Sequence, residues 1–355
     1  MGKIFYLISN KDSSKRYTQY SQHLKELFNC KVYKVTLDAG FSCPNRDGTI
    51  SSGGCIFCED GGSFSQAHSG QLSINEQLDI SIKKLKDRFG AEKFISYFQA
   101  YSNTYASVEK LKSLYDEAVS HPEVVGLSIG TRPDCVNEEK IRLISSYAER
   151  NISNNFLSHT PCPLPQGRGG IIGEGAKPPH LDTLKKYEVW VEYGLQSIHN
   201  KTLKLINRGH SAEDFIKAYE LTRKVGKDIK ICVHVILGLP GETRKEMLET
   251  AKVLADLGID GIKIHLLCAL KDTELEKMYN RGEFNPISAE DYVDTVCDYL
   301  EILPQETIIH RLAGNGLKKI LVAPKWLPEK FKVLNLIDRE LQRRGTFQGS
   351  GFVSQ

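Results

Sequence analysis

The sequence contains no apolar run long enough to span a membrane and no strong charge of one sign. Its 355 residues include 47 Lys and Arg against 44 Asp and Glu, which gives a net charge of +3. A short apolar stretch at residues 4–8 is not followed by a small-residue cleavage site of the A-x-A type, which argues against a signal peptide. The weak positive charge permits an acidic partner such as RNA without requiring one. We therefore expect a cytoplasmic protein without a membrane partner.

Cysteine occurs nine times, an odd number, and most of the cysteines stand alone. Because nothing marks the chain as secreted, we do not expect a disulfide framework. Three cysteines do gather in one loop, with the spacing C-x11-C-x2-C: Cys43, Cys55 and Cys58. The residues between them are mainly Asn, Asp, Ser and Gly, which form turns and let a backbone wrap around a small object.

The number of cysteines in this loop is informative. Thiolates are the usual ligands of zinc and of iron–sulfur clusters, and a closed tetrahedral site needs four ligands. Three thiolates on a cubic 4Fe-4S cluster would leave one iron with an open position, which indicates chemistry rather than a structural role. The alternative is a structural zinc site that a distant Cys or His completes.

Strand-like apolar segments alternate with amphipathic helices along the chain. Three of the expected helices begin with a capping box, formed by Ser73 with Glu76, Ser211 with Asp214, and Thr243 with Glu246. Alternation of this kind favours parallel strands joined by right-handed crossovers, with the working face built from the loops after the strands. Six strands are predicted, at residues 32–37, 94–98, 124–129, 187–193, 229–237 and 261–267.

The predicted organisation has three parts. Residues 1–30 form an approach segment, residues 31–285 form the α/β barrel, and residues 286–355 form a C-terminal extension of helices with an apolar segment at 307–311. Residues 156–181 are dense in Pro and Gly and lack an apolar period, so they cannot form a long helix or strand. We interpret them as an inserted loop between a helix and the following strand.

The string Cys43-Pro44-Asn45-Arg46-Asp47-Gly48-Thr49, followed by Gly53-Gly54-Cys55-Ile56-Phe57-Cys58, resembles the cluster loop of one family of radical S-adenosylmethionine (SAM) enzymes. This is the YhcC/YtqA (MnmL) family, which is related to the catalytic subunit of Elongator. The resemblance extends from Arg16 to about Gln348, with the insertion as its one interruption. It implies a partial, open (β/α)6 radical SAM barrel with a helical C-terminal extension. It also implies a 4Fe-4S cluster on the three cysteines, which binds SAM at its open iron and cleaves it to a 5′-deoxyadenosyl radical.

The resemblance also implies contacts to SAM at the ends of the strands. Phe57 resembles an aromatic residue that packs near adenine, and Gln99 stands where many relatives have a Gly-Gly-Glu motif for the methionyl amine. Glu192 and Gln196 would bind ribose hydroxyls at the end of the fourth strand. The plainer alternatives are core packing for Phe57 and solvation of the barrel mouth for Glu192 and Gln196.

Two further segments fit the expected SAM site. The stretch from Ile236 to Gly241, with Gly238 and Leu239 at its centre, would contact adenine through its backbone, because glycine permits close approach. Its alternative is an ordinary strand-to-helix turn. Arg208 and His210 belong to an Asn-Arg-Gly-His string that resembles the Elongator-like branch, and they would contact SAM or the substrate.

The remaining candidates for substrate contact lie near strand ends. The planar fork of Arg132 suits a carboxylate, and its alternative is an ion pair with Asp134. Tyr101, like Tyr97, would donate a hydrogen atom or stack on a base, although packing is the more common role of such residues. By strand parity His265 faces the same side of the sheet as His234, where a buried, hydrogen-bonded histidine is the alternative. Cys135 and Cys268 are at most single reactive thiols.

A basic run near the C-terminus is the candidate RNA surface, and a solvated helix face is its alternative. It combines cations for phosphates with aromatic residues for stacking: Lys325, Lys330, Lys332, Arg339, Arg343 and Arg344 with Trp326, Phe331 and Phe347.

The resemblance implies that the substrate is tRNA and that the reaction converts a 5-carboxymethylaminomethyl group on the wobble uridine to 5-aminomethyl. An electron donor such as flavodoxin or ferredoxin would reduce the cluster. The alternatives are a radical SAM enzyme for another RNA position or a small metabolite, and a non-catalytic, zinc-stabilised RNA-binding protein.

Overall fold

We describe a computed structural model of the chain, which covers residues 15–59, 72–152, 185–314, 319–327 and 330–353. The predicted insertion at 156–181 and the apolar stretch at 4–8 lie outside the described residues. In the described parts of the chain, no helix is both long enough and apolar enough to cross a membrane.

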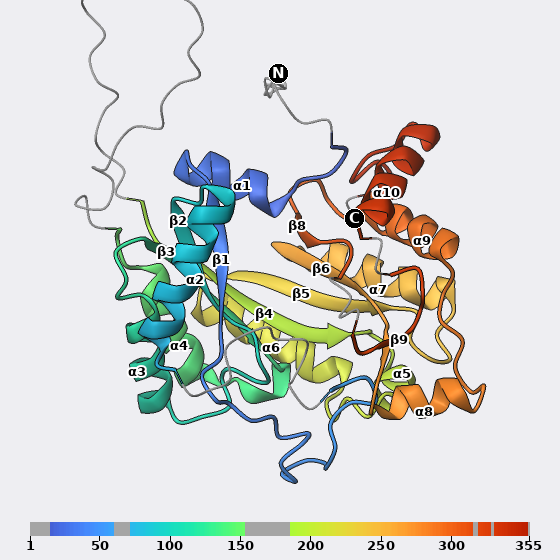
Figure 1. Ribbon diagram of the computed structural model, residues 1–355, viewed down its shortest axis with the longest axis horizontal. Coiled ribbons are helices and arrows are strands. Elements are labelled where there is room, and N and C mark those ends of the chain that lie inside the picture. The colour runs from blue at the N-terminus through green and yellow to red at the C-terminus, as the bar shows by residue number, and fades with distance from the viewer. Residues whose placement is uncertain (1–14, 60–71, 153–184, 315–318, 328–329, 354–355) are drawn as a thin grey trace, which may run out of the picture.

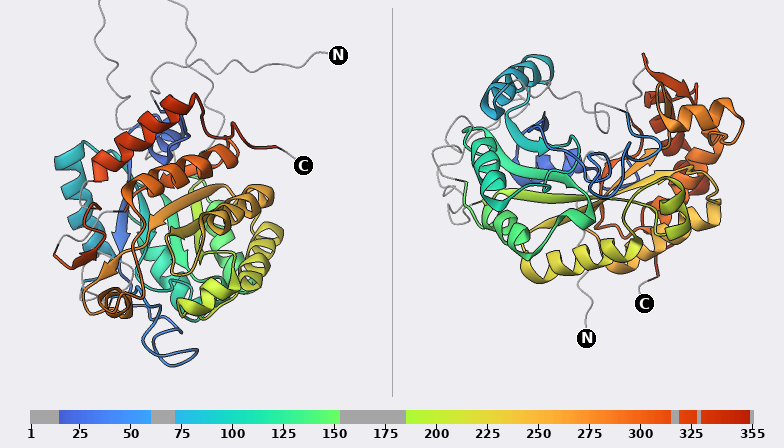
Figure 2. Two further views of the ribbon diagram at one scale, coloured as in Figure 1. Left: turned by 90° about the vertical axis from the view of Figure 1, so that its right-hand side faces the viewer. Right: turned by 90° about the horizontal axis from the view of Figure 1, so that it is seen from below.

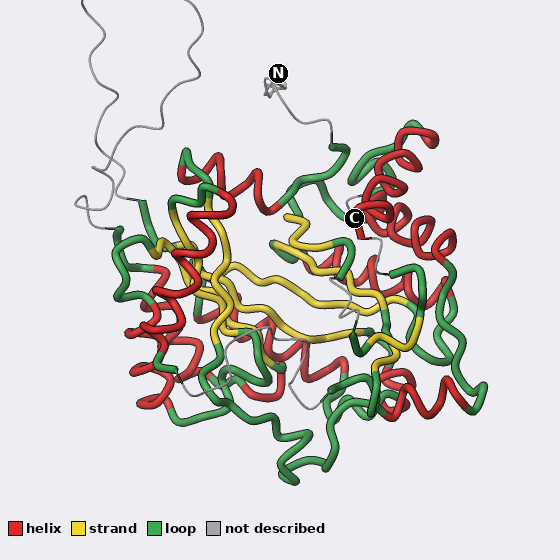
Figure 3. Tube along the Cα trace, in the orientation of Figure 1, coloured by secondary structure: helices red, strands yellow, loops and turns green. Residues whose placement is uncertain are grey.

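A seven-stranded, fully parallel sheet forms the centre of the structure (Figures 1 and 3), in the spatial order β1-β2-β3-β4-β5-β6-β8. A second, two-stranded sheet pairs β7 with β9 in antiparallel fashion. The strands are β1 (Val32–Leu37), β2 (Lys93–Phe98), β3 (Val124–Thr131), β4 (Glu188–Gln196), β5 (Lys230–Leu237), β6 (Gly261–Leu266), β7 (Ala269–Leu270), β8 (Ile308–Arg311) and β9 (Leu321–Ala323).

The large sheet curves into an open half-barrel, with helices along its convex face (Figure 2, right). This confirms the predicted fold class, and all six predicted strands are present. The structure adds a seventh strand, because β8 pairs with β6, whereas the sequence analysis assigned residues 307–311 to the C-terminal extension. A strand of four residues is too short to show a reliable period.

Most of the helices follow strands, and α2, α3, α4, α6, α7, α8 and α9 begin at a residue whose side chain caps the helix. All three predicted capping boxes are confirmed, at Ser73, Ser211 and Thr243. The helices are α1 (Tyr20–Phe28), α2 (Ile74–Phe89), α3 (Val108–Ala118), the 3-10 helix η1 (Pro133–Cys135), α4 (Glu138–Ala148), α5 (Asn200–Leu205), α6 (Ala212–Val225), α7 (Arg244–Leu257), α8 (Glu274–Asn280), α9 (Ala289–Ile302) and α10 (Lys330–Arg344).

Alternate residues of each strand face opposite sides of the sheet. Val35 and Leu37 of β1 face outward and belong to the large apolar cluster that includes Leu78 and Ile82 of α2. Lys34, directly before Val35, points inward, where its Nζ is 3.1 Å from Ser128 Oγ. The outward residues therefore hold the helices on the sheet, while the inward residues are free to build a different, polar interior.

An aromatic cluster closes the half-barrel at the N-terminal ends of its strands. The ring of Tyr20 from α1 stacks on His310 with 3.9 Å between centroids, and Trp190 meets His310 edge-on at 4.4 Å. Trp190 is fully buried, in one apolar cluster with Ile95 and Cys232. Because this end is filled, a cavity can form only nearer the C-terminal ends of the strands.

Gly126 on β3 is required by close packing between neighbouring strands. A Cβ there would overlap the carbonyl oxygen of Glu188 and the side chain of Ile95. We expect Gly126→Ala to lower the free energy of unfolding by about 1–3 kcal/mol, as overpacking does. Urea unfolding measures this, with Gly314→Ala as the control, because a Cβ at Gly314 meets nothing within 4 Å. Equal stability of the two variants would contradict this account of the packing.

Candidate active site

The three clustered cysteines lie on a cavity of about 300 Å³ at the C-terminal ends of the strands. Every strand of the large sheet contributes at least one residue to its lining, from Thr36 of β1 to Arg311 of β8. Figure 2 (right) shows the loop that carries the cysteines lying against the hollow side of the curved sheet. This is the face on which parallel α/β folds carry their active sites.

The Asn-Arg-Gly-His string anchors the cysteine loop. The side chain of Asn207 donates to the carbonyl oxygen of Gly54 at 2.7 Å, and the backbone N–H of Ile56 donates to the carbonyl oxygen of Ile206 at 3.1 Å. Gly209 has φ +76°, and a Cβ there would overlap the amide oxygen of Asn45. The string therefore holds the loop by direct contact, and its glycine is required by that close approach.

Two buried donors point at the sulfur of Cys55. Nη1 of Arg208 and Nδ2 of Asn45 each lie 3.6 Å from Sγ. The other nitrogens of Arg208 donate to the carbonyl oxygen of Gly194, so the guanidinium is held in place. These two donors therefore hold the side chain of Cys55 in a fixed position in the loop.

The spacing of the sulfurs fits a cluster better than a single zinc ion. Thiolates around one zinc ion lie about 3.8 Å apart, since Zn–S bonds are about 2.3 Å long and tetrahedral. Within the described ranges, Cys43, Cys55 and Cys58 do not form a set with all sulfurs within 4.8 Å of one another. The larger 4Fe-4S cluster accommodates wider spacing, so the donor set fits the cluster that the sequence predicts.

Most of the predicted SAM-contacting residues meet at the cavity. Phe57, Gln99, Glu192, Gln196 and Arg208 all line it together with the cysteines.

Of the segment from Ile236 to Gly241, which was predicted to contact adenine, only part reaches the cavity in the described structure. Ile236 lines the cavity, but Gly238 and Leu239 are not among its described lining residues. Leu239 instead packs in the apolar cluster that contains Ile236 and Leu203, and the N–H of Gly238 lies 3.3 Å from the sulfur of Met247. The physical reason is that Ile236 is the last inward-facing residue of β5, and the chain then turns away into α7.

Three polar atoms in the cavity lining are buried and lack a hydrogen-bond partner among the described residues: Oγ of Ser102 in the loop after β2, and two on the strands themselves, Oε1 of Gln196 and Nε2 of His265. Gln196 also has φ +80° and follows an irregularity in the pairing of β4 with β5. Unpaired buried polar groups are costly, and strained backbone gathers at functional sites. Gln196 and His265 are therefore positioned to bind a ligand.

Arg132 does not offer a free fork for a carboxylate. Its Nε and Nη2 bind the two oxygens of Asp134 at 2.9 and 2.6 Å, and its Nη1 donates to the carbonyl oxygen of Arg208 at 2.8 Å. The structure thus shows the alternative role, an ion pair with Asp134, although Arg132 still borders the cavity.

Of the other residues predicted to contact the substrate, Tyr101 lies at the cavity and His210 lies behind its lining. Tyr101 lines the cavity with φ +61°. His210 does not line it in the described structure; its ring nitrogens are each 3.1 Å from a carbonyl oxygen, of Gly194 and of Ser211. Burial and the neighbouring Arg208 lower the pKa of His210 to about 3, so it is a neutral supporting residue.

Burial raises the pKa of Cys135 and of Cys268 to about 12, which keeps both as unreactive thiols.

Glu192 is the centre of a buried polar layer beneath the cysteine loop. Its Oε1 binds Lys34 and lies 2.5 Å from Ser128 Oγ, while its Oε2 binds Lys263 and lies 2.8 Å from His234 Nε2. Burial opposes ionisation of this carboxyl, but the two lysines outweigh it and hold its pKa well below the usual value. Because both oxygens have two partners, the predicted ribose contact of Glu192 is not available in this arrangement.

Glu192, Cys232 and His234 place three potential metal-ligating atoms within 4.8 Å of one another. The ammonium groups of Lys34 and Lys263 already share the carboxylate, and burial raises the pKa of Cys232. A further cation is therefore disfavoured at this position.

Lys34, Lys263 and Arg311 are the interior residues that the sequence analysis missed. A signal for two of them existed, since Lys34 and Lys263 share the strand parity of inward-facing positions. Arg311 gave none, because β8 was not recognised as part of the sheet.

We expect Glu192→Gln to lower the free energy of unfolding by about 3–5 kcal/mol, because it leaves two buried ammonium groups without their carboxylate. Urea unfolding of the purified protein measures this. The control is Glu138→Gln, which removes an exposed carboxylate paired with Arg142 on α4 and should change stability little. Similar midpoints for the two variants would show that the buried layer does not depend on Glu192.

Sequence comparisons support this description. Residues 169–254 match the radical SAM superfamily, and residues 259–343 match the Radical_SAM C-terminal domain. YtqA of Bacillus subtilis (strain 168) is 38% identical over 341 residues, which are 96% of this chain and 94% of YtqA. YhcC of Escherichia coli (strain K12) is 38% identical over 320 residues, which are 90% of each protein. A tRNA uridine(34) acetyltransferase of Methanocaldococcus infernus is 38% identical over 118 residues, 32% of this chain and 22% of that enzyme.

Among solved structures, Methanocaldococcus infernus Elp3 with an N-terminal deletion superposes with a TM-score of 0.60 at 20% identity, over 89% of this chain and 64% of that chain. This likeness supports the fold. Enzymes of the radical SAM superfamily bind a 4Fe-4S cluster and SAM, and the cavity presents three cysteines that fit such a cluster. Because YtqA and YhcC match over nearly their whole lengths, the chain belongs to the radical SAM enzymes, in the family of YtqA and YhcC.

Proposed function

We propose that this radical SAM enzyme modifies tRNA at the wobble uridine, converting a 5-carboxymethylaminomethyl group to 5-aminomethyl. The observation that carries the tRNA assignment is the 118-residue stretch that is 38% identical to an enzyme named as a tRNA uridine(34) acetyltransferase. In the proposed reaction the carbon beside the nitrogen of the arm would lose a hydrogen atom and then one further electron, to a one-electron acceptor, and a proton; water would then hydrolyse the resulting imine, leaving the aminomethyl group on the uridine and releasing glyoxylate. The reaction would take place in the cytoplasm, with flavodoxin or ferredoxin as electron donor.

The residues of the cavity divide into those that would hold the cofactors and those left for the substrate. Cys43, Cys55 and Cys58 would hold the cluster, which together with SAM supplies a 5′-deoxyadenosyl radical when bound. Phe57 and Ile236 provide apolar surface suited to adenine. The polar lining that remains is available to orient the substrate and exclude water.

Gln99 and Gln196 are the candidates to bind the polar parts of SAM. Both line the cavity, and Oε1 of Gln196 has no partner among the described residues. An amide can donate to and accept from ribose hydroxyls or the methionyl group. With Glu192 engaged by lysines, we assign the ribose contact to Gln196.

The C-terminal basic run is a smaller RNA surface than its composition suggests. Arg344 binds Asp294, Asp298, Glu301 and Glu340, and Arg343 binds Glu340. These ion pairs hold α10 against α9. The run also contains Trp326, which donates to the carbonyl oxygen of Ile287 at 3.2 Å and packs near Tyr292.

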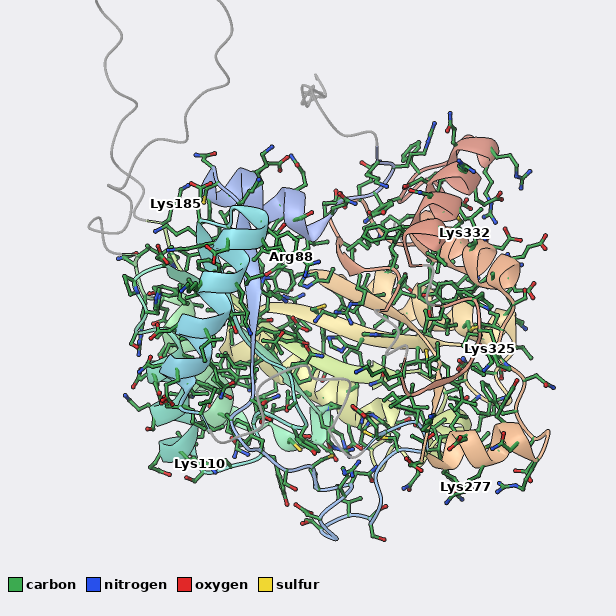
Figure 4. The ribbon with its side chains drawn as sticks, in the orientation of Figure 1. Arg88, Lys110, Lys185, Lys277, Lys325 and Lys332 are labelled. Atoms are coloured by element: carbon green, nitrogen blue, oxygen red, sulfur yellow. The ribbon has the colours of Figure 1, made fainter. Side chains whose placement is uncertain are left out.

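Exposed groups for RNA do occur, in two places. Phe331 at the start of α10 is 80% exposed, and Phe347 is 44% exposed. Figure 4 shows Lys110 on α3 and Lys277 on α8 at the edge of the molecule where the cysteine loop lies, on either side of that loop. We propose that the tRNA backbone approaches this edge, which places the target base at the cavity mouth.

Two alternatives differ in their support. A radical SAM enzyme acting on another RNA position or on a small metabolite would use the same cavity and is the second candidate. A non-catalytic, zinc-stabilised RNA-binding protein is disfavoured by the family and by the wide spacing of the three sulfurs.

Analysis of modified nucleosides tests the proposed substrate. tRNA from a strain lacking this protein should accumulate 5-carboxymethylaminomethyl nucleosides at the expense of 5-aminomethyl forms. Expression of the wild-type chain should restore the profile, whereas Cys55→Ala, which removes one cluster ligand, should not. An unchanged nucleoside profile in the deletion strain would refute this substrate.

Arg208 should set the reduction potential of the bound cluster, because its guanidinium lies 3.6 Å from Cys55 Sγ. A nearby positive charge stabilises the more negative, reduced cluster. We expect Arg208→Met to shift the midpoint potential to more negative values, on the order of 60 mV, which corresponds to a tenfold change in equilibrium constant for one electron. Redox titration followed by electron paramagnetic resonance measures the shift.

Arg208→Lys is the matched variant, since it keeps the charge and loses only the fork, and it should retain most of the wild-type potential. Iron content of each variant separates a change in potential from a loss of cluster. If Arg208→Met retains the wild-type potential with full iron loading, the guanidinium does not act on the cluster.

A further inference from the structure

The interior of the half-barrel contains more positive than negative charge. In the layer beside the cavity, Lys34 of β1, Lys263 of β6 and Arg311 of β8 lie near the carboxylate of Glu192, while Glu188 pairs with Lys230 closer to the N-terminal ends of the strands. Glu192 satisfies Lys34 and Lys263. In the parts of the chain that the structure describes, no carboxylate lies within ion-pair distance of Arg311. Arg311 is half-buried and lines the cavity, so its charge can attract an anion that enters there.

Arg311 and Lys263 are neighbours across the β6–β8 pair. Their Cα atoms are register partners in the parallel pairing, and adjacent strands lie about 4.8 Å apart. Both side chains line the cavity. Both charges also act on His234: burial first, then Lys263 and, more weakly, Arg311 lower the pKa of His234 to about 4. Two adjacent cations facing one cavity form a natural anion-binding position.

His265 borders the same position. It lines the cavity two residues after Lys263 on the same face of β6, and its Nε2 is buried without a partner among the residues described. Burial and the nearby His234 hold the pKa of His265 well below its usual range, so the ring is neutral. In the tautomer protonated at Nε2, this atom is a hydrogen-bond donor that lacks an acceptor.

We propose that Arg311, Lys263 and His265 form a subsite that binds a carboxylate of the substrate inside the half-barrel. The planar fork of Arg311 matches a carboxylate through two parallel hydrogen bonds, Lys263 adds charge, and His265 adds one donor. The proposal rests on the proposed function, in which the group removed from tRNA ends in a carboxylate. In this proposal Arg311 takes the role of carboxylate binding that the sequence suggested for Arg132 or Arg208. The guanidinium groups of those two residues are already bound, by Asp134 and by the carbonyl oxygen of Gly194.

A carboxylate fits this position better than a phosphate of the RNA backbone. A phosphodiester is flanked by two nucleotides, so it stays at the mouth, where the exposed lysines lie. A carboxylate at the end of a short arm on a base can enter a cavity of about 300 Å³ and reach the interior layer. The subsite would therefore select substrates by the charge at the end of the arm.

Steady-state kinetics of Arg311→Gln tests the subsite with the cluster-loaded enzyme and tRNA that carries the 5-carboxymethylaminomethyl group. The KM for this tRNA should rise roughly tenfold to a hundredfold, as expected for loss of a hydrogen bond to a charged group. Iron content and 5′-deoxyadenosine formation without tRNA are measured for each variant, so that the KM is compared at equal amounts of cluster-loaded enzyme. Arg142→Gln, which removes an exposed arginine on α4, is the matched control and should keep the wild-type KM.

The product tRNA provides an internal comparison, because its 5-aminomethyl group has no carboxylate. Wild-type enzyme and Arg311→Gln should bind product tRNA equally. Arg311→Lys, which retains a cation, should recover part of the lost substrate affinity. A wild-type KM in Arg311→Gln, or equal weakening of substrate and product binding, would overturn the subsite while leaving the proposed function intact.

A binding measurement with a small probe is independent of turnover. N-methylglycine has the same carboxymethylamino group as the proposed substrate arm, and N-methylglycinamide is its uncharged counterpart. Saturation-transfer NMR with the oxidised holoenzyme should detect N-methylglycine but not the amide. The signal should be lost in Arg311→Gln and kept in Arg142→Gln.

The two experiments separate the two proposals. Arg311-dependent binding of N-methylglycine by an enzyme that does not convert the tRNA would overturn the proposed substrate and support the subsite. Equal signals for the acid and the amide, no signal for the acid, or a signal that survives Arg311→Gln would overturn the subsite.

Discussion

The alternation of side chains along a curved parallel sheet is the constraint on which this structure depends. On one face each strand must supply apolar residues that pack against the helices, and on the other face it must supply the residues of the interior, many of which are polar. β1 shows both, with Val35 and Leu37 in the outer core and Lys34 in the interior. The stability of the barrel and the chemistry of its cavity are therefore encoded in alternate residues of the same strands. The outer positions can remain apolar while the inner positions are specialised.

The interior is arranged in layers along the strands. At the N-terminal ends, Tyr20, Trp190 and His310 fill the space. The layer of Glu192 and its lysines follows, and the cysteine loop covers it at the C-terminal ends. The order follows from access to solvent: the filled layer excludes water, the paired charges lie where they are desolvated, and the thiols of the cysteine loop lie where a cofactor could enter.

Much of this could be predicted from the sequence, because the relevant signals are local. The capping boxes at Ser73, Ser211 and Thr243 fixed the starts of three helices, and the C-x11-C-x2-C spacing with its turn-forming residues indicated the cluster loop. Hydrogen-bond and ion-pair partners were harder to predict, because they depend on which residues are close in three dimensions. The engagement of Arg132 by Asp134 was considered as an alternative, whereas the four partners of Glu192 come from strands far apart in the sequence.

Arg311 shows why the remaining part could not be predicted. Its strand has only four residues, and its inward position depends on a shift in register: Ile262 pairs with Ile309, but Lys263 pairs with Arg311 rather than His310. This shift permits His310 to stack in the aromatic layer while the next residue, Arg311, reaches the cavity. Strict alternation would have sent these two residues to opposite faces. No residue pattern in the sequence specifies such an irregularity.

The buried charges have a functional rather than a stabilising explanation. Replacing a buried ion pair with apolar residues of similar volume is often neutral or stabilising, so the fold alone does not require Glu192, Lys34 and Lys263. If carboxylates neutralised all of the interior cations, no positive charge would remain to bind an anionic ligand. Here Glu192 pairs with Lys34 and Lys263 but not with Arg311, whose charge remains at the cavity. Glu192 fixes the positions of the lysines by pairing with them, and in the proposed subsite Arg311, which it does not neutralise, would give the interior its preference for an anion. Such an interior would be ordered before the substrate arrives and would also select for the charge of the proposed substrate arm.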